Sequence, residues 1–514
     1  MKKGGPSPFT RRDFLIGSGC TLASIALSLH LEAETQNEGV DLASDPRRPQ
    51  FHLLPARNWM NDPNGPIYFR GYYHMFFQFN PLGATWGNMS WNHAISRDML
   101  HWELLPLALT PTADSADSFG CFSGSAVQMD GRVYLVYTGT RKSAPALATL
   151  KDGKITVQES QCLAYSDDPY LIHWTKVKQP VIALPPAGLK VTGFRDPAVW
   201  RDAGWYFMTI GSGEEKVGGC VLLYRSRDLR HWTYLHKLVS GPGTGNPTVN
   251  PVEDGEMWEC PDFFALGHGH VLIYSTQGKV YWQSGVLDPV SMIFKPAKSG
   301  LLDLDAFYAP KTQLDAHGRR ILWGWIPERR SEEQMRQAGW SGAMSLPKLL
   351  SLDTDGTLRM QMLPELSTLR GAEITAASSV GKKTTVLPGA SGEIVCEAEQ
   401  RRAFSFTLSS TASEILHIDY DPLQHAFHVN GSKVQLLDRD SPTLRVFVDA
   451  SITETLLGER ISCTGRFYPS AKTAPDLQAT TTGATLRAWT IRPISPNRLT
   501  TLSTMTEKYA GRQP

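Results

Sequence analysis

A five-fold internal repeat is the feature that most restricts what this chain can fold into. A glycine followed by an aromatic or β-branched run occurs five times, at Gly71, Gly131, Gly204, Gly269 and Gly318. Each run has the composition of a β-strand, and each glycine suits a hairpin turn. Strand repeats with one turn signal per unit are typical of a β-propeller. The sequence therefore predicts an all-β fold that begins with a five-bladed β-propeller over residues 48–360.

A second signal alternates with the glycine turns. Ser96-Arg-Asp98 leads to His101-Trp102, and the same pattern recurs over residues 166–174 and 226–232. One such turn per unit is what a blade corner would supply. We interpret these residues as structural corners and not as ligand-binding groups.

The character of the chain changes after about residue 350. Pro364–Arg370 has the pattern of a short linking helix, and short alternating segments with frequent turns follow it. Alternation of this kind is typical of a β-sandwich. We expect a linker over 361–372 and a C-terminal β-sandwich over 373–505, with no helical periodicity in either domain.

The N-terminal segment has the features of an export signal. Arg11-Arg12 precedes an apolar run that ends near Leu31. This resembles a twin-arginine signal peptide, which we assign to residues 1–34. We expect export to the periplasm or the cell exterior; the alternative is an uncleaved membrane anchor. No later stretch is apolar enough to cross a membrane, so no membrane association is expected after leader removal.

Charge and cysteine content restrict the partners. The chain has 51 Lys and Arg against 50 Asp and Glu, with no block of like charge. This balance gives no support for a nucleic-acid partner and suits a neutral, polyol-like substrate. The seven cysteines form no CxxC pair and no Cys/His cluster, so no metal and no cofactor are expected. The sequence leaves disulfides, and the choice between monomer and homo-oligomer, open.

The strongest candidate for chemistry is the motif Trp59-Met-Asn61-Asp62-Pro63-Asn-Gly65. Pro63 favours an extended backbone at Asp62, and the Asn-Gly step makes a tight turn. A carboxylate on a stiffened strand end suits a nucleophile. The motif by itself fits an ordinary Asx-Pro turn equally well.

Two further acidic motifs lie in other repeat units. Phe194-Arg195-Asp196-Pro197 by itself favours a surface turn, whereas Trp258-Glu259-Cys260-Pro261-Asp262 places an acid among apolar neighbours. Burial of that kind suits a general acid, although Asp262 is a rival within the motif and a salt-bridged glutamate fits as well. Two carboxyl groups flanking a glycosidic bond are the general solution for its hydrolysis.

The three motifs, in this order, resemble the signatures of glycoside hydrolase family 32, which contains invertases, exo-inulinases and levanases. The resemblance covers about residues 48–505. Lesser matches include the steps at Gln78, Trp86, Trp91 and Phe122-Ser123, the segments at Asp303 and Phe307–Ala309, and Arg445–Ser451 with Glu454. Asn92 and Leu456 depart from the usual glycine and phenylalanine.

The resemblance implies roles for individual residues. Asp62 would be the nucleophile, Glu259 the acid/base, and Asp196 a stabiliser of the transition state. The implied substrate-binding residues are Trp59, Asn61, Gln78, Trp86, Trp91, Phe122, Ser123, Arg195 and Asp303. The implied fold is again a five-bladed propeller followed by a β-sandwich.

The implied activity is hydrolysis of terminal β-D-fructofuranosyl bonds in sucrose, inulin or levan. It would proceed by double displacement with retention through a covalent fructosyl-enzyme. The alternatives are a fructosyltransferase with the same residues, an arabinan- or xylan-cleaving propeller glycosidase, and a carbohydrate-binding protein without turnover. The sequence does not decide among the fructoside substrates.

Overall fold

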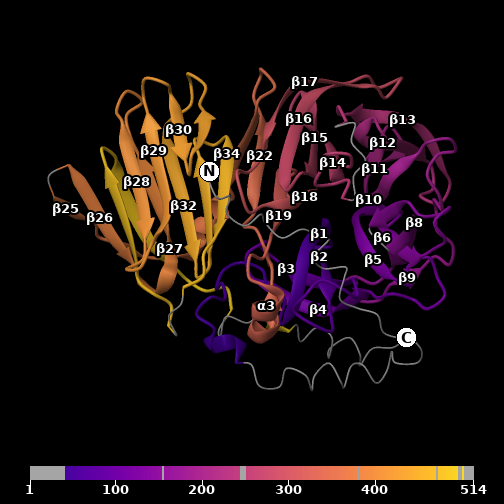
Figure 1. The fold of residues 1–514 in the computed structure, drawn as a ribbon, viewed down its shortest axis with the longest axis horizontal. Helices are drawn as coiled ribbons and strands as arrows, with labels where there is room; N and C mark the ends of the chain where they lie inside the picture. The colour runs from indigo at the N-terminus through magenta and orange to yellow at the C-terminus, as the bar shows by residue number, and fades with distance from the viewer. Residues whose placement is uncertain are drawn as a thin grey trace, which may run out of the picture.

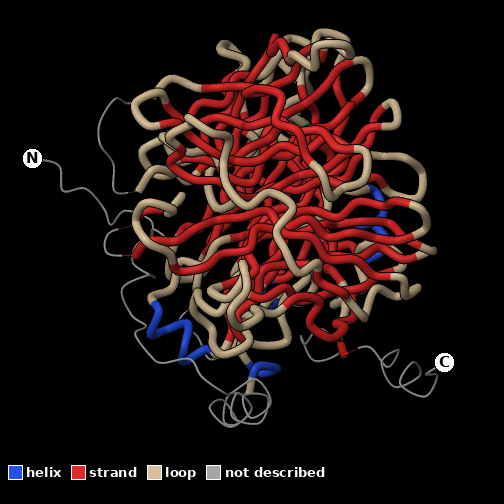
Figure 2. Tube along the Cα trace, turned by 90° about the vertical axis from the view of Figure 1, so that its right-hand side faces the viewer, coloured by secondary structure: helices blue, strands red, loops and turns tan. Residues whose placement is uncertain are grey.

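The computed structural model describes residues 41–152, 155–243, 250–379, 381–469, 473–495 and 501–502. The expected leader, residues 1–34, lies outside these ranges. Figure 1 shows two bodies side by side, and Figure 2 shows that strands make up most of the fold. The body on the right of Figure 1 is a propeller, and the orange and yellow body on the left is a β-sandwich.

Five mainly antiparallel sheets form the propeller blades. The first contains β1 (Asn58–Phe69), β2 (Tyr72–Asn80), β3 (Ser90–Ser96) and β4 (Trp102–Leu109), flanked by β20 (Trp340–Ser341) and β37 (Thr501–Leu502). The second contains β5 (Gly120–Met129), β6 (Arg132–Lys142), β7 (Leu150–Asp152), β8 (Ile155–Ser166) and β9 (Thr175–Lys176). The third contains β10 (Val191–Asp202), β11 (Trp205–Glu214), β12 (Gly218–Ser226) and β13 (Trp232–Ser240).

The remaining two blades close the ring. The fourth contains β14 (Glu259–Leu266), β15 (Gly269–Thr276), β16 (Lys279–Leu287) and β17 (Phe294–Leu301). The fifth contains β18 (Tyr308–Leu314), β19 (Arg320–Ile326), β21 (Ala343–Met344), β22 (Lys348–Leu352) and β23 (Leu358–Met362). The first strands β1, β5, β10, β14 and β18 contact one another in turn, and β18 returns to β1. The prediction of five blades is confirmed.

The glycine repeat is the hairpin between the first and second strands of each blade. In the first three blades both turn residues have positive φ, at positions 70–71, 130–131 and 203–204. This is the type I′ geometry that matches the twist of paired strands and favours glycine. In the fourth blade Gly267 takes the positive φ, and the glycine of the repeat, Gly269, begins β15.

The Ser-x-Asp turns are blade corners, as expected. Asp98 accepts backbone N–H bonds from Leu100 and His101, and Asp168 and Asp228 accept equivalent bonds in the next two blades. The following tryptophan donates its indole N–H to the carbonyl three residues earlier, as Trp102 does to Met99. These side chains form their hydrogen bonds within their own turn, so their role is structural.

The C-terminal body consists of two packed sheets. One contains β24 (Arg370–Ile374), β27 (Ser391–Glu397), β32 (Thr443–Asp449), β33 (Ile452–Leu457), β34 (Ile461–Arg466) and β36 (Thr485–Ile491). The other contains β25 (Ala377–Ser379), β26 (Lys382–Leu387), β28 (Phe404–Ser409), β29 (Glu414–Asp421), β30 (Ala426–Val429), β31 (Ser432–Gln435) and β35 (Leu477–Thr482). Their facing apolar side chains form one core that includes Phe406, Ile418 and Val446. This arrangement is a β-sandwich.

Helices are few in the part of the chain that the structure describes. They are η1 (Leu42–Ser44), α3 (Glu332–Ala338), η2 (Pro364–Leu369) and η3 (Pro388–Ala390). The short helix expected near residue 364 is η2. The α-helix α3 was not expected, because seven residues are too few to show a helical period. A capping box between Ser331 and Gln334 begins α3, and Gly339 ends it with φ of 72°.

The two domains are joined by buried polar groups. Asp449 on β32 accepts the backbone N–H groups of Gln50, Phe51 and His52, which precede the first blade. The apolar core of the first, fourth and fifth blades also reaches Phe447 and Leu456 of the sandwich. At its end the chain returns to the propeller, because β37 pairs with β4. Residues 501–502 therefore belong to the first blade and not to the expected sandwich range of 373–505.

Candidate active site

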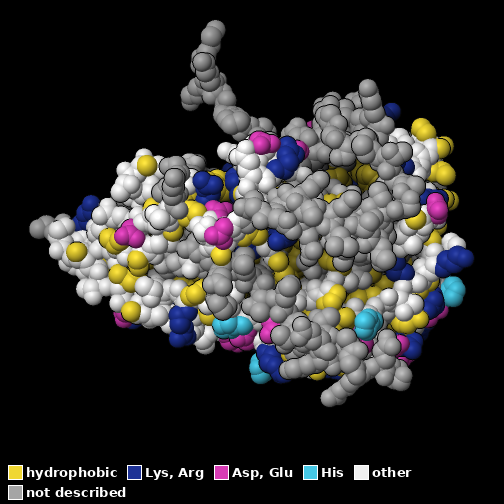
Figure 3. All heavy atoms as spheres, turned by 90° about the horizontal axis from the view of Figure 1, so that it is seen from below, with side chains coloured by type: hydrophobic (Ala, Val, Ile, Leu, Met, Phe, Trp, Pro, Cys, Tyr) yellow, Lys and Arg dark blue, Asp and Glu magenta, His cyan; other side chains and the backbone are white. Residues whose placement is uncertain are grey.

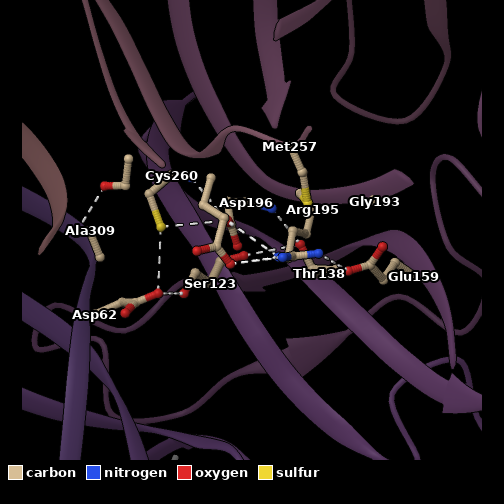
Figure 4. Close-up of polar contacts among 12 residues, drawn as sticks. Asp62, Ser123, Thr138, Glu159, Gly193, Arg195, Asp196, Met257, Cys260 and Ala309 are labelled. Carbon is tan, nitrogen blue, oxygen red and sulfur yellow. Dashed lines mark hydrogen bonds and ion pairs between the residues drawn. The ribbon is translucent and has the colours of Figure 1, made fainter. Parts of the chain in front are cut away.

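Each first strand of a blade has a β-bulge at the same place. The register against the second strand shifts between residues 60 and 63, 122 and 124, 195 and 198, 259 and 262, and 308 and 311. The bulged residues are Asp62, Ser123, Asp196, Cys260 and Ala309. Bulges re-aim side chains next to functional sites. Figure 4 shows these five residues, one from each blade, around one centre.

Proline explains why the bulges form at these positions. Pro63, Pro197, Pro261 and Pro310 follow the bulged residue in four of the five blades. Proline has no N–H for a ladder hydrogen bond, so it is confined to such irregular places in a sheet. Asp196, Cys260 and Ala309 have φ of 63°, 50° and 51°. Such strained conformations of residues other than glycine cluster at functional sites.

Asp62 lies on β1 and is held by donors on both oxygens. Its Oδ2 accepts a hydrogen bond of 2.5 Å from the Ser123 hydroxyl, and its Oδ1 accepts one of 3.0 Å from Asn61 Nδ2. Asn61 is fixed in turn by Trp59 Nε1 at 2.7 Å and by the side chain of Gln78. These two bonds fix the orientation of the Asp62 carboxylate.

Cys260 links the first carboxylate to the second. Its thiol lies 3.5 Å from Asp62 Oδ2 and 3.4 Å from Asp196 Oδ2, and its backbone N–H donates to Asp196 Oδ2 at 2.9 Å. Burial, together with the charges of Asp196 and Asp62, raises the pKa of this thiol well above its ordinary value. Cys260 is therefore a neutral S–H donor between two carboxylates.

The third carboxylate, Glu259, is bound by an arginine and a tyrosine. Arg195 donates to Glu259 Oε1 through Nε at 3.0 Å and through Nη2 at 2.8 Å, and Tyr308 donates to Oε2 at 2.8 Å. Burial would lower the pKa of Arg195, but Glu259, Glu159 and Asp196 outweigh it and raise that pKa. Arg195 is thus a permanent cation, 4.0 Å from Asp196 Oδ2 through its Nε.

Aromatic side chains lie next to two of the residues that hold Asp62, because Trp59 is bonded to Asn61 and Phe122 precedes Ser123. Trp59, Phe122 and the half-buried Trp86 belong to one apolar group, with Met335 of α3 against them. Trp86 packs edge-on against Phe122, and Trp59 packs against Trp325. An aromatic wall beside a polar centre is what binding of a sugar ring requires, because its apolar face packs on aromatic rings while its hydroxyls form hydrogen bonds.

Two of the residues expected to bind substrate lie elsewhere. Trp91 is fully buried in the core between the first two blades, and its indole N–H donates to the Phe122 carbonyl. Asp303 is buried at the domain junction, where it accepts the hydroxyls of Ser462 and Thr464 at 2.5 and 2.7 Å. We therefore correct both assignments to structural roles. Gln78 contacts Asn61, so it supports the site through that residue.

Sequence reasoning missed four residues that contact the site. Tyr308 holds Glu259, Cys260 joins two carboxylates, Thr138 Oγ1 accepts the N–H of Asp196, and Glu159 binds Arg195. The repeated X-Pro step would have found Cys260, which occupies its first position, and it would have drawn attention to Tyr308, which stands just before Ala309-Pro310. Thr138 and Glu159 lie on other strands and have no local signal of this kind.

Three observations on the described ranges concern metal ligands, cysteines and membrane-spanning helices. No group of three or more His, Cys, Asp or Glu residues is placed to hold a metal ion there. The six cysteines of those ranges are free and buried. In the same ranges no helix is long and apolar enough to span a membrane. On the face in Figure 3, acidic and basic side chains are intermixed.

Comparison with known proteins decides the family. The model described as the glycosyl hydrolases family 32 N-terminal domain matches residues 52–362, and the model of the family 32 C-terminal domain matches residues 365–492. This chain belongs to glycosyl hydrolase family 32. Both the propeller and the sandwich are therefore family 32 domains.

Individual members of family 32 are similar to this chain over most of their length. The sucrose-6-phosphate hydrolase of Escherichia coli is 35% identical over 456 residues, which are 82% of this chain and 89% of that protein. The beta-fructofuranosidase 1 of Zea mays is 30% identical, over 82% of this chain and 75% of its own. The structure of a family 32 beta-fructofuranosidase from Bombyx mori superposes with a TM-score of 0.77 at 27% identity, over 91% of this chain and 98% of that one.

Proposed function

We propose that this family 32 hydrolase cleaves terminal β-D-fructofuranosyl bonds in sucrose and fructans by double displacement with retention. The observation that carries the proposal is the convergence of three buried carboxylates: Asp62 and Asp196 from the bulges of two blades, and Glu259 from the position just before the bulge of a third. The names of relatives support the choice of sugar. They include a raffinose invertase of Escherichia coli, and a fructan 1-exohydrolase of Cichorium intybus in complex with 1-kestose.

In the first step Asp62 attacks the anomeric carbon of the fructosyl unit. The bonds from Ser123 and Asn61 orient this carboxylate for attack. Glu259 gives its proton to the leaving oxygen, so that the glycosidic bond breaks as the bond to Asp62 forms. In the second step Glu259 takes a proton from water, which attacks the same carbon and releases Asp62.

Asp196 and Arg195 form no covalent bond and transfer no proton in these steps; Asp196 acts electrostatically, and Arg195 positions Glu259. Asp196 is held by the N–H of Cys260 and by its own N–H to Thr138, so its carboxylate has one fixed position. A fixed negative charge beside the sugar ring stabilises the oxocarbenium-like transition state. Arg195 positions Glu259 for proton transfer.

The test is release of fructose from matched substrates. Purified protein is incubated with sucrose, sucrose 6-phosphate, inulin, levan and a nitrophenyl arabinoside, and free fructose and glucose are measured. We expect fructose from sucrose or a fructan and no cleavage of the arabinoside. Equal fructose and glucose at high sucrose concentration indicates hydrolysis, whereas excess glucose indicates fructosyl transfer. No fructose from any of the four fructosides would refute the proposal.

We also propose that the protein is exported through the twin-arginine pathway. The support is the Arg11-Arg12 pair before an apolar run in residues 1–34. Replacing both arginines by lysine should leave the activity in the cytoplasmic fraction, while the unmodified chain delivers it outside the cytoplasm. Equal distribution of the two proteins would contradict export by this route.

A further inference from the structure

Glu159 is a fully buried acid behind the active site. It lies on β8, in the second blade, and its side chain is bonded on both oxygens. Its Oε1 accepts Arg195 Nη1 at 2.8 Å, and its Oε2 accepts the Phe194 N–H at 2.7 Å and the Thr149 hydroxyl at 2.9 Å. Glu159 therefore fixes both the side chain of Arg195 and the backbone of β10 just before Asp196.

Arg195 lies between Glu159 and Glu259. One nitrogen, Nη1, points to Glu159, and the other two, Nε and Nη2, point to Glu259. Figure 4 shows Glu159 on the far side of the guanidinium from Asp62 and Cys260. One buried cation thus bridges a carboxylate that reacts and a carboxylate that lies outside the reacting centre.

This arrangement answers a requirement of acid catalysis. Glu259 has to carry a proton when the leaving group departs, but a nearby cation favours the ionised form of a carboxylate. A second carboxylate on the same guanidinium offsets that cation at short range, because buried charges are weakly screened. Arg195 can then position Glu259 without holding it permanently ionised.

We propose that Glu159 is a positioning residue for the reaction, which orients Arg195 from behind and neutralises its charge so that Glu259 can be protonated. The other charged or titratable groups around Glu259 and Cys260 come from three strands besides β14. They are Asp62, Arg195, Asp196, Tyr308 and Lys311. Glu159 reaches Glu259 through Arg195, and its bond to the Phe194 N–H also holds β10, so the test needs a readout that reports the proton of Glu259 and not activity alone.

The inference rests on the proposed function, because it assigns Glu259 as the acid/base. The test is the pH profile of kcat/KM for Glu159→Gln, which keeps the size of the side chain and removes its charge. The alkaline limb, which reports loss of the proton from Glu259, should move to lower pH by about one unit. At acidic pH, where Glu259 is protonated in both proteins, kcat/KM should differ less than at alkaline pH.

Two controls separate this role from a merely structural one. Glu393 is an equally buried carboxylate bound by Arg370 and Arg445, but it lies in the sandwich, so Glu393→Gln should leave the limb in place. Glu159→Asp keeps the charge and draws it back from Arg195, so it should give a smaller shift in the same direction. The aspartate variant also serves as the test if Glu159→Gln fails to fold.

An alkaline limb that stays in place in whichever Glu159 variant folds would overturn the proposal, even if activity falls. The profile is measured on whichever glycoside the wild-type protein cleaves. Absence of any fructosidase activity therefore refutes the proposed function, whereas an unmoved limb refutes the role of Glu159 alone.

Discussion

Glu454 should contribute strongly to the free energy of unfolding, because it is a buried ion-pair partner between the two domains. It lies on β33 of the sandwich, is fully buried, and accepts His52 Nε2 at 3.0 Å and the Leu346 N–H at 2.6 Å. It also pairs with Lys348, which is equally buried. All three partners belong to the propeller domain or the segment before it, so Glu454 joins the two domains.

Replacing Glu454 by glutamine should cost about 3 kcal/mol. Burial would raise the pKa of Glu454, but Lys348 and His52 outweigh it and lower that pKa from 4.5 to about 2. At about 1.4 kcal/mol per pH unit, this displacement corresponds to roughly 3 kcal/mol of stability. Removing one member of a buried ion pair typically costs about 3–5 kcal/mol, which agrees.

The pH dependence follows from the direction of the shift. The pKa of Glu454 is lowered in the folded state. Its contribution to the free energy of unfolding is therefore complete above about pH 4.5 and is lost as pH falls toward 2. The difference between wild type and Glu454→Gln should therefore shrink to about half by pH 3. His52 has a raised pKa: burial lowers it, but Asp449 and Glu454 raise it more. Its contribution is complete below about pH 6.5 and is lost as pH rises through the folded-state pKa.

The assay is urea unfolding followed by tryptophan fluorescence at several pH values. The control is Glu373→Gln, an exposed partner of Arg487, which should have little effect. Adding Lys348→Met to Glu454→Gln should recover part of the loss, because it removes the buried cation left without its partner. A loss below about 1 kcal/mol at pH 7, or one independent of pH, would refute the reasoning.

Three further variants test individual contacts. Ser123→Ala removes a charge-assisted bond to Asp62 and should lower kcat/KM about 10- to 100-fold. The control Ser125→Ala, on the same strand, should change kcat/KM little. Equal effects of the two variants would contradict the role of Ser123 in holding Asp62. Tyr308→Phe removes a donor to the ionised form of Glu259, so the alkaline limb of kcat/KM should move to higher pH; a fixed limb would argue against this contact. Thr464→Val removes one donor to Asp303 and should lower the free energy of unfolding by about 1–3 kcal/mol with kcat/KM unchanged. A lowered kcat/KM with unchanged stability would instead place Asp303 in the substrate site.

The fold could be predicted because it repeats a local signal. Four blades have a two-residue hairpin between their first two strands, and positive φ at the turn favours glycine, so the requirement is visible in the sequence. The helix α3 was missed because two turns are too short for a period. The return of β37 to the first blade was missed because a two-residue parallel pairing has no sequence pattern.

The site was predictable only in part, for a similar reason. Asp62 and Asp196 precede prolines that mark the bulges. Each motif by itself also fits an ordinary turn, so the roles of both residues were predicted from the resemblance to family 32. Trp91 was misplaced because nothing local shows which side of β3 faces the core between blades. Asp303 was misplaced because its partners, Ser462 and Thr464, lie about 160 positions away. Glu159 was missed because its role depends on a contact between two blades.

The kcat of Asp62→Asn on the best fructoside substrate tests the central claim most directly. Asparagine keeps the size of the side chain and cannot form the covalent intermediate at an ordinary rate. We expect kcat to fall by about four or more orders of magnitude, with an unchanged unfolding transition. Near wild-type turnover by the folded variant would contradict the assignment of Asp62 as the nucleophile.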